Sequence, residues 1–283
     1  MGIVDGKDYH YFLLIYGIYL MLGYLAGFRF PRIEAYVGHF APLNCLIGIV
    51  LIVTDLITAK FSLFAPPFFV SFAQIINQMV SDHHLLLLST LSSLGLWTVS
   101  FIVGALVGIA IGLFIGRYRN FNYWTFPFLK VIGIIPAAAW MPITMVIFPS
   151  SYMAEVFLIV LAVWFPVAFM TAGGVQSIPK EYFESAKTLG FSEARIMRKV
   201  VIPGALPNIF VGFFTAMGLS FTMLVISEMI GAKFGLGWYI NWAKGVGNYT
   251  QVYAAIVIMA VLFSIIFSLL TSVERRILIW NEN

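Results

Sequence analysis

The sequence predicts an all-α, polytopic transmembrane helical bundle, and three observations support that fold class. Only 10% of the 283 residues are charged and 61% are hydrophobic, whereas a soluble domain carries about 25% charged residues. Seven apolar segments are each long enough to cross a bilayer, which takes about 20 residues. One polar stretch, residues 177–207, interrupts them and contains eight of the charged side chains. The chain is therefore expected to lie in a membrane and to expose one polar loop.

The expected spans divide the chain into two regions. Residues 1–64 form an N-terminal pair of transmembrane helices, and residues 65–280 form the main transmembrane domain. At the start of the second region, residues 68–80 are expected to form an amphipathic helix at the outer membrane surface. The seven spans are expected at residues 9–28, 41–60, 86–116, 124–148, 153–175, 208–230 and 252–273.

The distribution of Lys and Arg predicts the orientation, because cytoplasmic loops carry an excess of these residues. With residues 177–207 placed in the cytoplasm, only Lys7, Lys60, Lys233 and Lys244 fall outside. The cytoplasmic set is Arg29, Arg32, Arg117, Arg119, Lys180, Lys187, Arg195, Arg198, Lys199, Arg275 and Arg276. We therefore expect a multi-pass protein of the cell membrane whose N-terminus lies outside and whose C-terminus lies in the cytoplasm.

Several classes of function are excluded by what the sequence lacks. Cys45 is the only cysteine, so no disulfide framework and no multi-cysteine metal site is expected. No Walker A phosphate-binding motif, catalytic Ser/His/Asp arrangement or metal-ligand cluster is present, so we expect no catalytic residue and no enzyme activity. The net charge of +4 does not indicate nucleic-acid binding, because the basic residues do not gather among stacking aromatics. No cleavable signal peptide is evident.

Three titratable residues have a structural explanation that we favour over a functional one. Adjacent His83 and His84 point away from each other on a helix, so a metal site is not expected. Asp55 falls within the second span, where a charge is unfavourable unless paired. We expect it to lie near an interface or to pair with Lys60 rather than to relay protons.

The polar stretch 177–207 reads as two short helices. Pro179 suits the first helical position, and Gly190 can take the left-handed conformation that ends a helix. Ser192 is a good N-cap for the second helix, which is expected to end near Pro203. By itself this pattern fits either a solvated hairpin between membrane helices or a surface on which a partner docks.

The third span contains regularly spaced glycines. Gly104, Gly108, Gly112 and Gly116 recur at four-residue steps and form a stripe where another helix can pack closely. That helix could belong to a second subunit or to the same chain, and we favour the same chain.

The fourth span cannot be one unbroken helix, because it contains several prolines. They are Pro127, Pro136, Pro142 and Pro149. Irregular backbone at membrane depth occurs against protein or along a water-filled path, so this span indicates either a transport path or a kinked packing helix. The fifth span repeats the theme with Trp164-Phe165-Pro166.

Residues 184–203 resemble the "EAA loop" of the membrane subunits of ABC importers. The pattern appears as Glu184-Ser185-Ala186, then Gly190, then Val200-x-Ile202-Pro203, with the spacing intact. Ser185, Val200 and Ile202 are mild departures from Ala, Ile and Leu. The segment Pro136–Pro142 is similar to a Pro-rich Ala-Trp-x-Pro motif of the same permeases. Residues 227–237 are similar to their Ala-Glu-Met-x-Gly-Ala-x-x-Gly-Leu-Gly segment. The resemblance covers about residues 65–280 and narrows to the nitrate, sulfonate, taurine and bicarbonate class.

The resemblance implies a permease subunit with the type I ABC importer fold. Its partners would be two cytoplasmic ATPase subunits, an extracytoplasmic substrate-binding protein and a second permease copy in a homodimer. ATP and Mg²⁺ would bind the ATPases, and this chain would hold no cofactor. The cargo would be a small anionic or organic solute such as a sulfonate, taurine or nitrate.

The resemblance also assigns candidate residues. Those expected to dock on the ATPase are Glu184, Ser185, Ala186, Leu189, Gly190 and Phe191. Those expected along the translocation path are Pro136, Trp140, Pro142, Phe165, Pro166 and Glu228. For Glu228 we favour a structural role, in which backbone N–H groups of the following glycine turn hold its carboxylate, over contact with the substrate.

Two rival functions from other classes stay open. A secondary transporter or channel would need coupling carboxylates in mid-membrane and inverted repeats, and the sequence offers only Asp55 and no clear repeat. A membrane anchor for a peripheral enzyme would leave the proline-broken spans unexplained. The sequence does not identify the substrate.

Overall fold

The computed structural model describes residues 68–279 continuously, together with a few scattered helical positions between residues 14 and 50. The two N-terminal spans predicted at 9–28 and 41–60, and the expectations for Cys45 and Asp55, lie outside the described residues.

Every regular element within residues 68–279 is a helix, as the sequence predicts. The α-helices are α3 Phe72–Ser81, α4 His83–Arg117, α5 Arg119–Ile134, α6 Met141–Ile147, α7 Ser151–Gln176, α8 Lys180–Thr188, α9 Glu193–Ile196, α10 Ile202–Gly231, α11 Leu236–Gly245 and α12 Tyr249–Ile277. A 3₁₀ turn, η2 Ala137–Trp140, precedes α6, and a π turn, η3 Met197–Val201, joins α9 to α10.

The five spans predicted after residue 65 are found. In the described part of the chain, α4, α7, α10 with its N-terminal extension, and α12 are each long and apolar enough to cross a membrane. The fourth predicted span is a broken one: α5 and the η2–α6 segment meet at an angle of 86°. Pro136 stands at this break, and Pro142 lies in the first turn of α6, where its missing N–H is tolerated.

The contacts divide the chain into two compact units. The first consists of residues 1–87 and 239–258, and the second of residues 88–238 and 259–283. In the first unit, α3 begins with a capping box in which the side chains of Ser71 and Gln74 each bond the other's backbone N–H. Asp82, directly after α3, accepts hydrogen bonds from the Tyr239 hydroxyl at 2.6 Å and the Gln251 amide at 2.7 Å.

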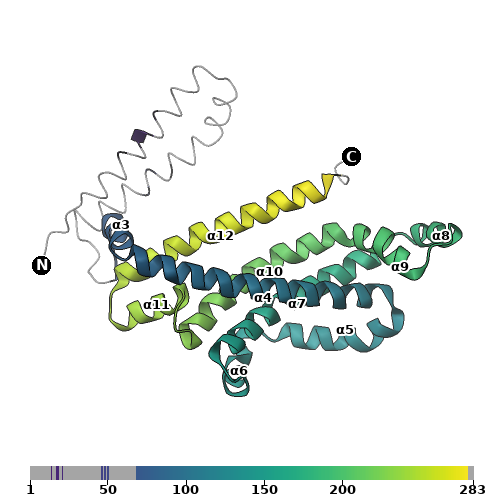
Figure 1. Ribbon diagram of the computed structural model, residues 1–283, viewed down its shortest axis with the longest axis horizontal. Coiled ribbons are helices and arrows are strands. Elements are labelled where there is room, and N and C mark those ends of the chain that lie inside the picture. Colours follow the sequence, from purple (N-terminus) through teal and green to yellow (C-terminus); the bar gives the residue numbers. More distant parts are fainter. Residues whose placement is uncertain are drawn as a thin grey trace, which may run out of the picture. The chain divides into compact units, whose positions relative to one another are not determined.

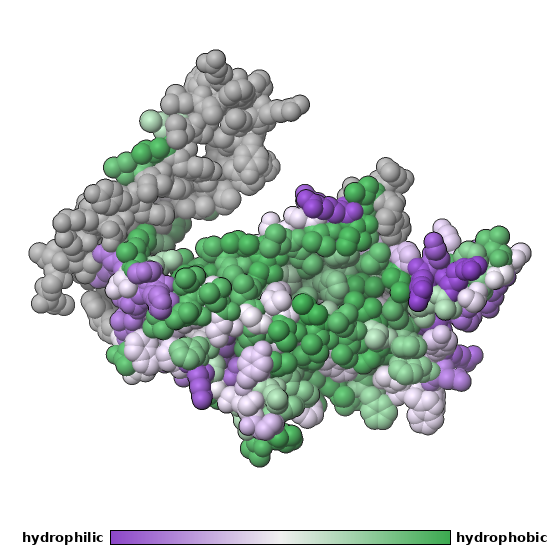
Figure 2. Space-filling view, in the orientation of Figure 1, coloured by the Kyte–Doolittle hydropathy of each residue, from purple (hydrophilic) through white to green (hydrophobic). Residues whose placement is uncertain are grey.

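The core of the second unit lies between α7 and α10, which run side by side (Figure 1). Leu158, Val163, Val167 and Ala216 in this core are fully buried. Figure 2 shows a hydrophobic surface along the middle of this unit and polar side chains gathered at the end formed by α8 and α9. A surface with this pattern is typical of helices that sit in a bilayer and expose one polar end.

The glycine stripe of α4 packs against α7 of the same chain, which confirms the favoured interpretation. Gly104, Gly108, Gly112 and Gly116 lie against a matching four-residue row on α7. That row is Val163, Val167, Thr171 and Val175. A Cβ added at Gly112 would lie 2.6 Å from the carbonyl oxygen of Ala168, so no larger residue fits at this helix distance.

The prediction that the second helix of the polar loop ends near Pro203 is wrong. The chain stays helical from Glu193 to Gly231. The reason is the π turn: the N–H of Ile202 bonds the carbonyl of Met197, five residues back. This wider turn brings Pro203 into the first turn of α10, where a proline needs no N–H donor.

Candidate functional site

The α8–α9 hairpin is closed by a Schellman motif around Gly190. The N–H of Gly190 bonds the carbonyl of Lys187 at 2.9 Å, and the N–H of Phe191 bonds the carbonyl of Ala186 at 3.0 Å. Gly190 has a φ of 72°, the left-handed conformation that the sequence predicts. Ser192 is the N-cap residue of α9, also as predicted. Pro179 lies one residue before α8 rather than in its first position.

The six predicted docking residues divide into an outer and an inner set. Glu184, Ser185, Leu189 and Gly190 are exposed. Ala186 is buried, and the Phe191 ring is half-buried in the same hydrophobic cluster, which also contains Ile196 and Val201. These two inner side chains therefore support the hairpin from within. Whether the outer set touches an ATPase stays a prediction.

Sequence reasoning missed one exposed residue of this surface. Tyr182 is 62% exposed and Leu189 is 71% exposed, which is unusual for large apolar side chains at a polar end of the molecule. Ser185 lies three residues after Tyr182 and four residues before Leu189, and this spacing puts all three on one helical face. The signal that could have found Tyr182 is this spacing from Leu189.

Arg117 at the end of α4 ties the hairpin to the transmembrane helices. Its guanidinium donates two hydrogen bonds to the Glu193 carboxylate, at 2.8 and 3.1 Å. The same guanidinium stacks over the Phe183 ring of α8 at 5.1 Å. One side chain thus contacts both helices of the hairpin. Both bonds come from the single Nη2 nitrogen, so Arg117 reaches both carboxylate oxygens of Glu193 with one arm of its guanidinium.

A cavity of about 350 Å³ opens at the break between α5 and α6. Two of the predicted path residues, Pro136 and Phe165, line it, together with Leu161, Trp164, Thr222 and Met223. The Phe165 ring lies directly on Gly133, where even a Cβ would overlap the ring. The lining holds no charged side chain, so the cavity is an apolar passage or pocket.

The other four predicted path residues do not line this cavity. Trp140 packs against the core of the second unit, and Pro142 is exposed on α6. Pro166 is buried within α7, with its carbonyl facing Gly212 of α10. Glu228 is 1% exposed, and its carboxylate accepts the N–H of Gly237 at 2.8 Å, as the structural interpretation of that residue expects.

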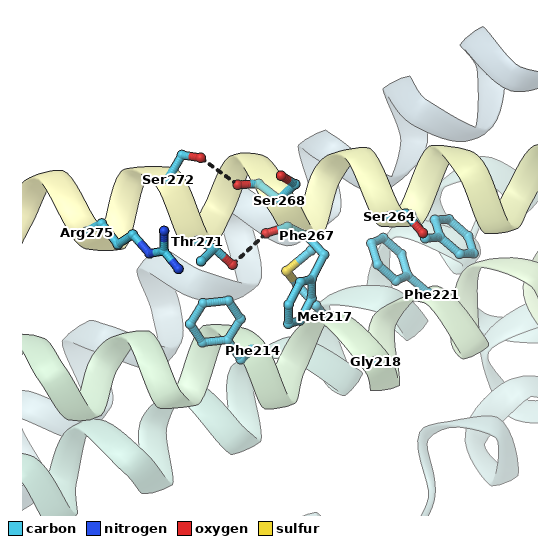
Figure 3. Close-up of a pocket in the computed structure, with 11 residues that line it drawn as sticks. Phe214, Met217, Gly218, Phe221, Ser264, Phe267, Ser268, Thr271, Ser272 and Arg275 are labelled. Atoms are coloured by element: carbon cyan, nitrogen blue, oxygen red, sulfur yellow. Dashed lines mark hydrogen bonds between the residues drawn. The ribbon is translucent and has the colours of Figure 1, made fainter. Parts of the chain in front are cut away.

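A second hollow, of about 650 Å³, runs between α10 and α12. Figure 3 shows its two walls: Phe214, Met217 and Phe221 from α10, and a row of hydroxyl side chains from α12. Thr271 and Ser272 donate to the carbonyls of Phe267 and Ser268, four residues back on the same helix. Arg275 lines the end of the hollow and is the one charged residue in its lining.

Comparison with known proteins places the chain in a family. The family model described as binding-protein-dependent transport system inner membrane component matches residues 104–279. This segment contains the α8–α9 hairpin, both hollows and the glycine stripe.

Curated relatives are permeases for small solutes. The bicarbonate transport system permease protein CmpB of Synechococcus elongatus is 34% identical over 173 residues, which cover 61% of this chain and 60% of that protein. The putative aliphatic sulfonates transport permease protein SsuC of Bacillus subtilis is 30% identical, covering 65% and 67%. The nitrate import permease protein NrtB of Leptolyngbya laminosa is 34% identical, covering 56% and 57%. The similarity thus spans less than two thirds of the bicarbonate and nitrate permeases.

Solved structures share the fold. A chain of the MetNI methionine ABC transporter in an inward facing conformation has a TM-score of 0.60 at 21% identity, covering 70% of this chain and 98% of that one. An amino acid ABC transporter solved with histidines has a TM-score of 0.59 at 20% identity, covering 75% and 100%. The family model covers well over half of the sequence, and the chain therefore belongs to the family of binding-protein-dependent transport system inner membrane components.

Proposed function

We propose that this chain is the membrane-spanning permease subunit of an ATP-driven ABC importer for a small oxyanion. The bicarbonate, nitrate and sulfonate relatives support the class of substrate, since all three names denote small oxygen-bearing anions. ATP and Mg²⁺ bind a separate ATPase subunit in this proposal, and an extracytoplasmic binding protein delivers the solute.

The observation that carries the proposal is the surface of the α8–α9 hairpin. Tyr182 in α8 and Leu189, the residue directly after α8, are exposed, and Ser185 lies between them in the sequence. A helix that presents large apolar side chains around a small one fits a groove on another protein. The Gly190 turn and the Arg117 contacts hold this face in a fixed orientation, so movement of a docked partner is transmitted to α4 and α10.

The arrangement of basic residues supports the proposed topology and assembly. Arg117 is the last residue of α4, and Arg275 lies in the last turn of α12. Arg195 and Arg198 lie in α9 and in the π turn after it. We place all of these helix ends in the cytoplasm. The C-terminus is then cytoplasmic and the N-terminus lies outside. Two such permeases, in a homodimer, would offer one hairpin to each of two ATPases.

The cavity at the α5–α6 break and the α10–α12 hollow are the candidate stretches of the path. Pro136 and Phe165 line the first, and Arg275 supplies positive charge to the second. An anion that leaves an apolar passage gains by meeting a guanidinium, which binds oxyanions through two parallel hydrogen bonds. We infer that the solute approaches Arg275 on its way to the cytoplasm.

The test is co-purification with a Walker-motif ATPase from a strain that expresses the tagged chain with its native neighbouring genes. In the double variant Tyr182→Ser/Leu189→Ser, we expect the ATPase to be lost while the permease remains folded. The matched control is Ile279→Ser, which also removes an exposed apolar side chain, 64% exposed, but far along the sequence from the hairpin.

The wild type and the Ile279→Ser control should both retain the ATPase. If the folded wild-type chain brings no ATPase, the importer proposal is wrong and a secondary transporter becomes the better explanation. If the ATPase is present and stays bound to the double variant, the docking surface has been assigned to the wrong residues.

A further inference from the structure

A third cavity, of about 590 Å³, lies at the end of α7 and α10 that is away from the α8–α9 hairpin. Its walls are α4, the start of α7 and the turn that follows α10. The volume is within the range of about 300–1,000 Å³ that is usual for small-molecule sites. Its lining contains charges of both signs, the carboxyl of Glu155 and the ammonium of Lys233. In the topology proposed above, this end of the helices faces the outside.

Glu155 is the buried acid of this cavity. It lies near the start of α7 and is 3% exposed. Within the described residues, its Oε1 accepts no hydrogen bond, and no Lys, Arg or His forms an ion pair with the carboxyl. Oε1 is sealed from solvent, so the carboxyl faces the cavity with its other oxygen. A buried carboxylate without a cation is unfavourable, and the positive group of a bound molecule would supply the missing partner.

Lys233 brings the opposite charge to the same cavity. It is exposed in the turn after α10, whereas Glu155 belongs to the buried wall. No ion pair joins the two side chains within the described residues, although both line one cavity. The cavity therefore holds a positive and a negative group that do not neutralise each other.

The N-terminus of α7 adds hydrogen-bond donors for an anion. Ser150 caps this helix, and its hydroxyl accepts the N–H of Met153 at 3.3 Å. The N–H groups of Ser151 and Tyr152 have no acceptor among the described residues, as is usual for the first turn of a helix. Ser150, Ser151 and Tyr152 all line the cavity. Free N–H groups at a helix N-terminus bind oxyanions, because the helix dipole places positive charge there.

A ligand with one sign of charge matches only part of this lining. An anion gains from Lys233 and from the α7 N-terminus, but the Glu155 carboxylate repels it. A cation gains from Glu155, but Lys233 and the positive end of the α7 dipole repel it. A small molecule that carries both an ammonium group and an oxyanion has a favourable partner for each of its charges.

We propose that this cavity binds a small zwitterion, with its ammonium group on Glu155 and its oxyanion between Lys233 and the N-terminus of α7. The inference rests on the proposed function, which places the cavity on the side from which a solute enters. It narrows the class of solute to oxyanions that also carry an ammonium group. The hydroxyl groups of Ser92 and Ser151 line the same space and can donate further hydrogen bonds to the oxyanion.

The first measurement is the binding of three probes to the purified full-length protein by saturation-transfer NMR, without ATP and without a binding protein. Taurine carries both charges, ethanesulfonate lacks the ammonium group, and ethylammonium lacks the sulfonate. We expect taurine to bind about tenfold more tightly than either of the other two, the difference that one charged contact supplies. Equal binding of taurine and a single-charge probe, or no binding of taurine, would overturn the proposal. Because the measurement needs neither ATP hydrolysis nor transport, it can fail while the co-purification test succeeds, and the reverse.

The second measurement repeats these titrations on three variants. Glu155→Gln keeps the size of the side chain and should remove the preference for taurine, while retained ethanesulfonate binding shows that the variant is folded. Lys233→Gln changes an exposed residue and should weaken the binding of both sulfonates at least several-fold. The matched control is Lys244→Gln, which removes a second exposed lysine that does not line the cavity and should leave binding unchanged. If Glu155→Gln retains the preference for taurine, or if Lys244→Gln weakens binding as much as Lys233→Gln, the proposed site is wrong.

Discussion

Asp82 shows how one residue can hold distant segments together. Partial burial acts to raise the pKa of its carboxyl, but hydrogen bonds from Tyr239, Gln251 and Gln78 outweigh that effect and hold the pKa below its ordinary value of 3.8. A lowered native pKa means that Asp82 stabilises the fold fully above its unfolded-state pKa. This stabilisation is lost as the pH falls through the native pKa.

Removal of the Tyr239 hydroxyl should therefore lower the free energy of unfolding at neutral pH and make it depend less on pH in the acid range. For Tyr239→Phe we expect a loss of about 1 kcal/mol at neutral pH, because a bond to a half-buried carboxylate is partly replaced by water. The difference from the wild type should shrink below about pH 4. Thermal unfolding of the purified protein over this pH range measures it. A difference that is equal at acid and neutral pH would show that lost packing, not the hydrogen bond to Asp82, is responsible.

Gly190 must adopt a positive φ, which asparagine can also adopt. Its φ of 72° is strained for a β-branched side chain, whereas asparagine tolerates this region. Gly190→Val should open the Schellman turn and weaken ATPase association at least several-fold, and Gly190→Asn should retain most of it. Open space surrounds the missing side chain, so backbone conformation and not a clash is tested. Equal association by both variants would show that the turn is not needed for docking.

At the scale of elements, the α4–α7 contact and the π turn decide how the helices are placed. The glycine stripe lets two apolar helices approach until backbone meets side chain, and the close approach aligns Arg117 with Glu193 and Phe183. The π turn keeps α9 and α10 in one helical run. The hairpin is thus joined to the spans by this continuous helix, by Arg117 and by the hydrophobic cluster in which Ala186 and Ile196 meet Val175 of α7.

A single methyl group should be enough to disturb the α4–α7 contact. In Gly112→Ala the new Cβ would lie 2.6 Å from both the Ala168 carbonyl oxygen and the Thr171 Cβ, so the helices must separate. We expect a loss of about 1–3 kcal/mol, as is usual for overpacked cores. Thermal unfolding in detergent or urea-assisted unfolding measures the change.

The control is Gly95→Ala in the same helix, where nothing lies within 4 Å of the added Cβ. There the substitution should leave stability unchanged or raise it by up to about 1 kcal/mol, because alanine favours the helix. If Gly112→Ala is as stable as Gly95→Ala, the two helices do not depend on the glycine stripe for their contact.

At the scale of the whole molecule, the proposed function assigns a path to the two hollows and a docking surface to the hairpin, and charge is scarce in the lining of the two hollows. Arg275 is the one charged residue in the lining of the α5–α6 cavity and of the α10–α12 hollow. Its neighbour Arg276 has the same charge and lies in the same turn of α12, but it does not line the hollow. A comparison of substitutions at Arg275 and Arg276 therefore tests whether the location of the positive charge in the hollow matters, since both substitutions remove the same charge.

Arg275→Gln should reduce ATP-dependent uptake of an oxyanion at least several-fold in proteoliposomes that contain the complete complex, and Arg276→Gln should not. Labelled nitrate, bicarbonate and taurine serve as probes, each with its binding protein. Equal uptake by the two variants would remove Arg275 from the path. Uptake of none of the probes by the wild type would instead count against the proposed class of substrate.

Much of this architecture could be predicted because it depends on local properties of the chain. The low charge content and the long apolar segments determine a membrane bundle. A glycine after a short helix determines the Schellman turn at Gly190. Several prolines within one span determine that the span is broken, although Pro127 stays inside α5 and the position of the break at Pro136 comes from the structure. Each of these conclusions needs only the residue type and its immediate neighbours.

Only the tertiary structure decided the features that join residues far apart in the sequence. Arg117 and Glu193 are separated by 76 positions, and nothing in the local pattern pairs them. The fate of Pro203 depended on the π turn Met197–Val201, and the burial of Glu155 and Glu228 depended on how the helices around them pack. Sequence alone specifies which elements form, because propensity and periodicity act over a few residues. Contact between elements follows from the fit of their side chains, which exists only once the helices are packed.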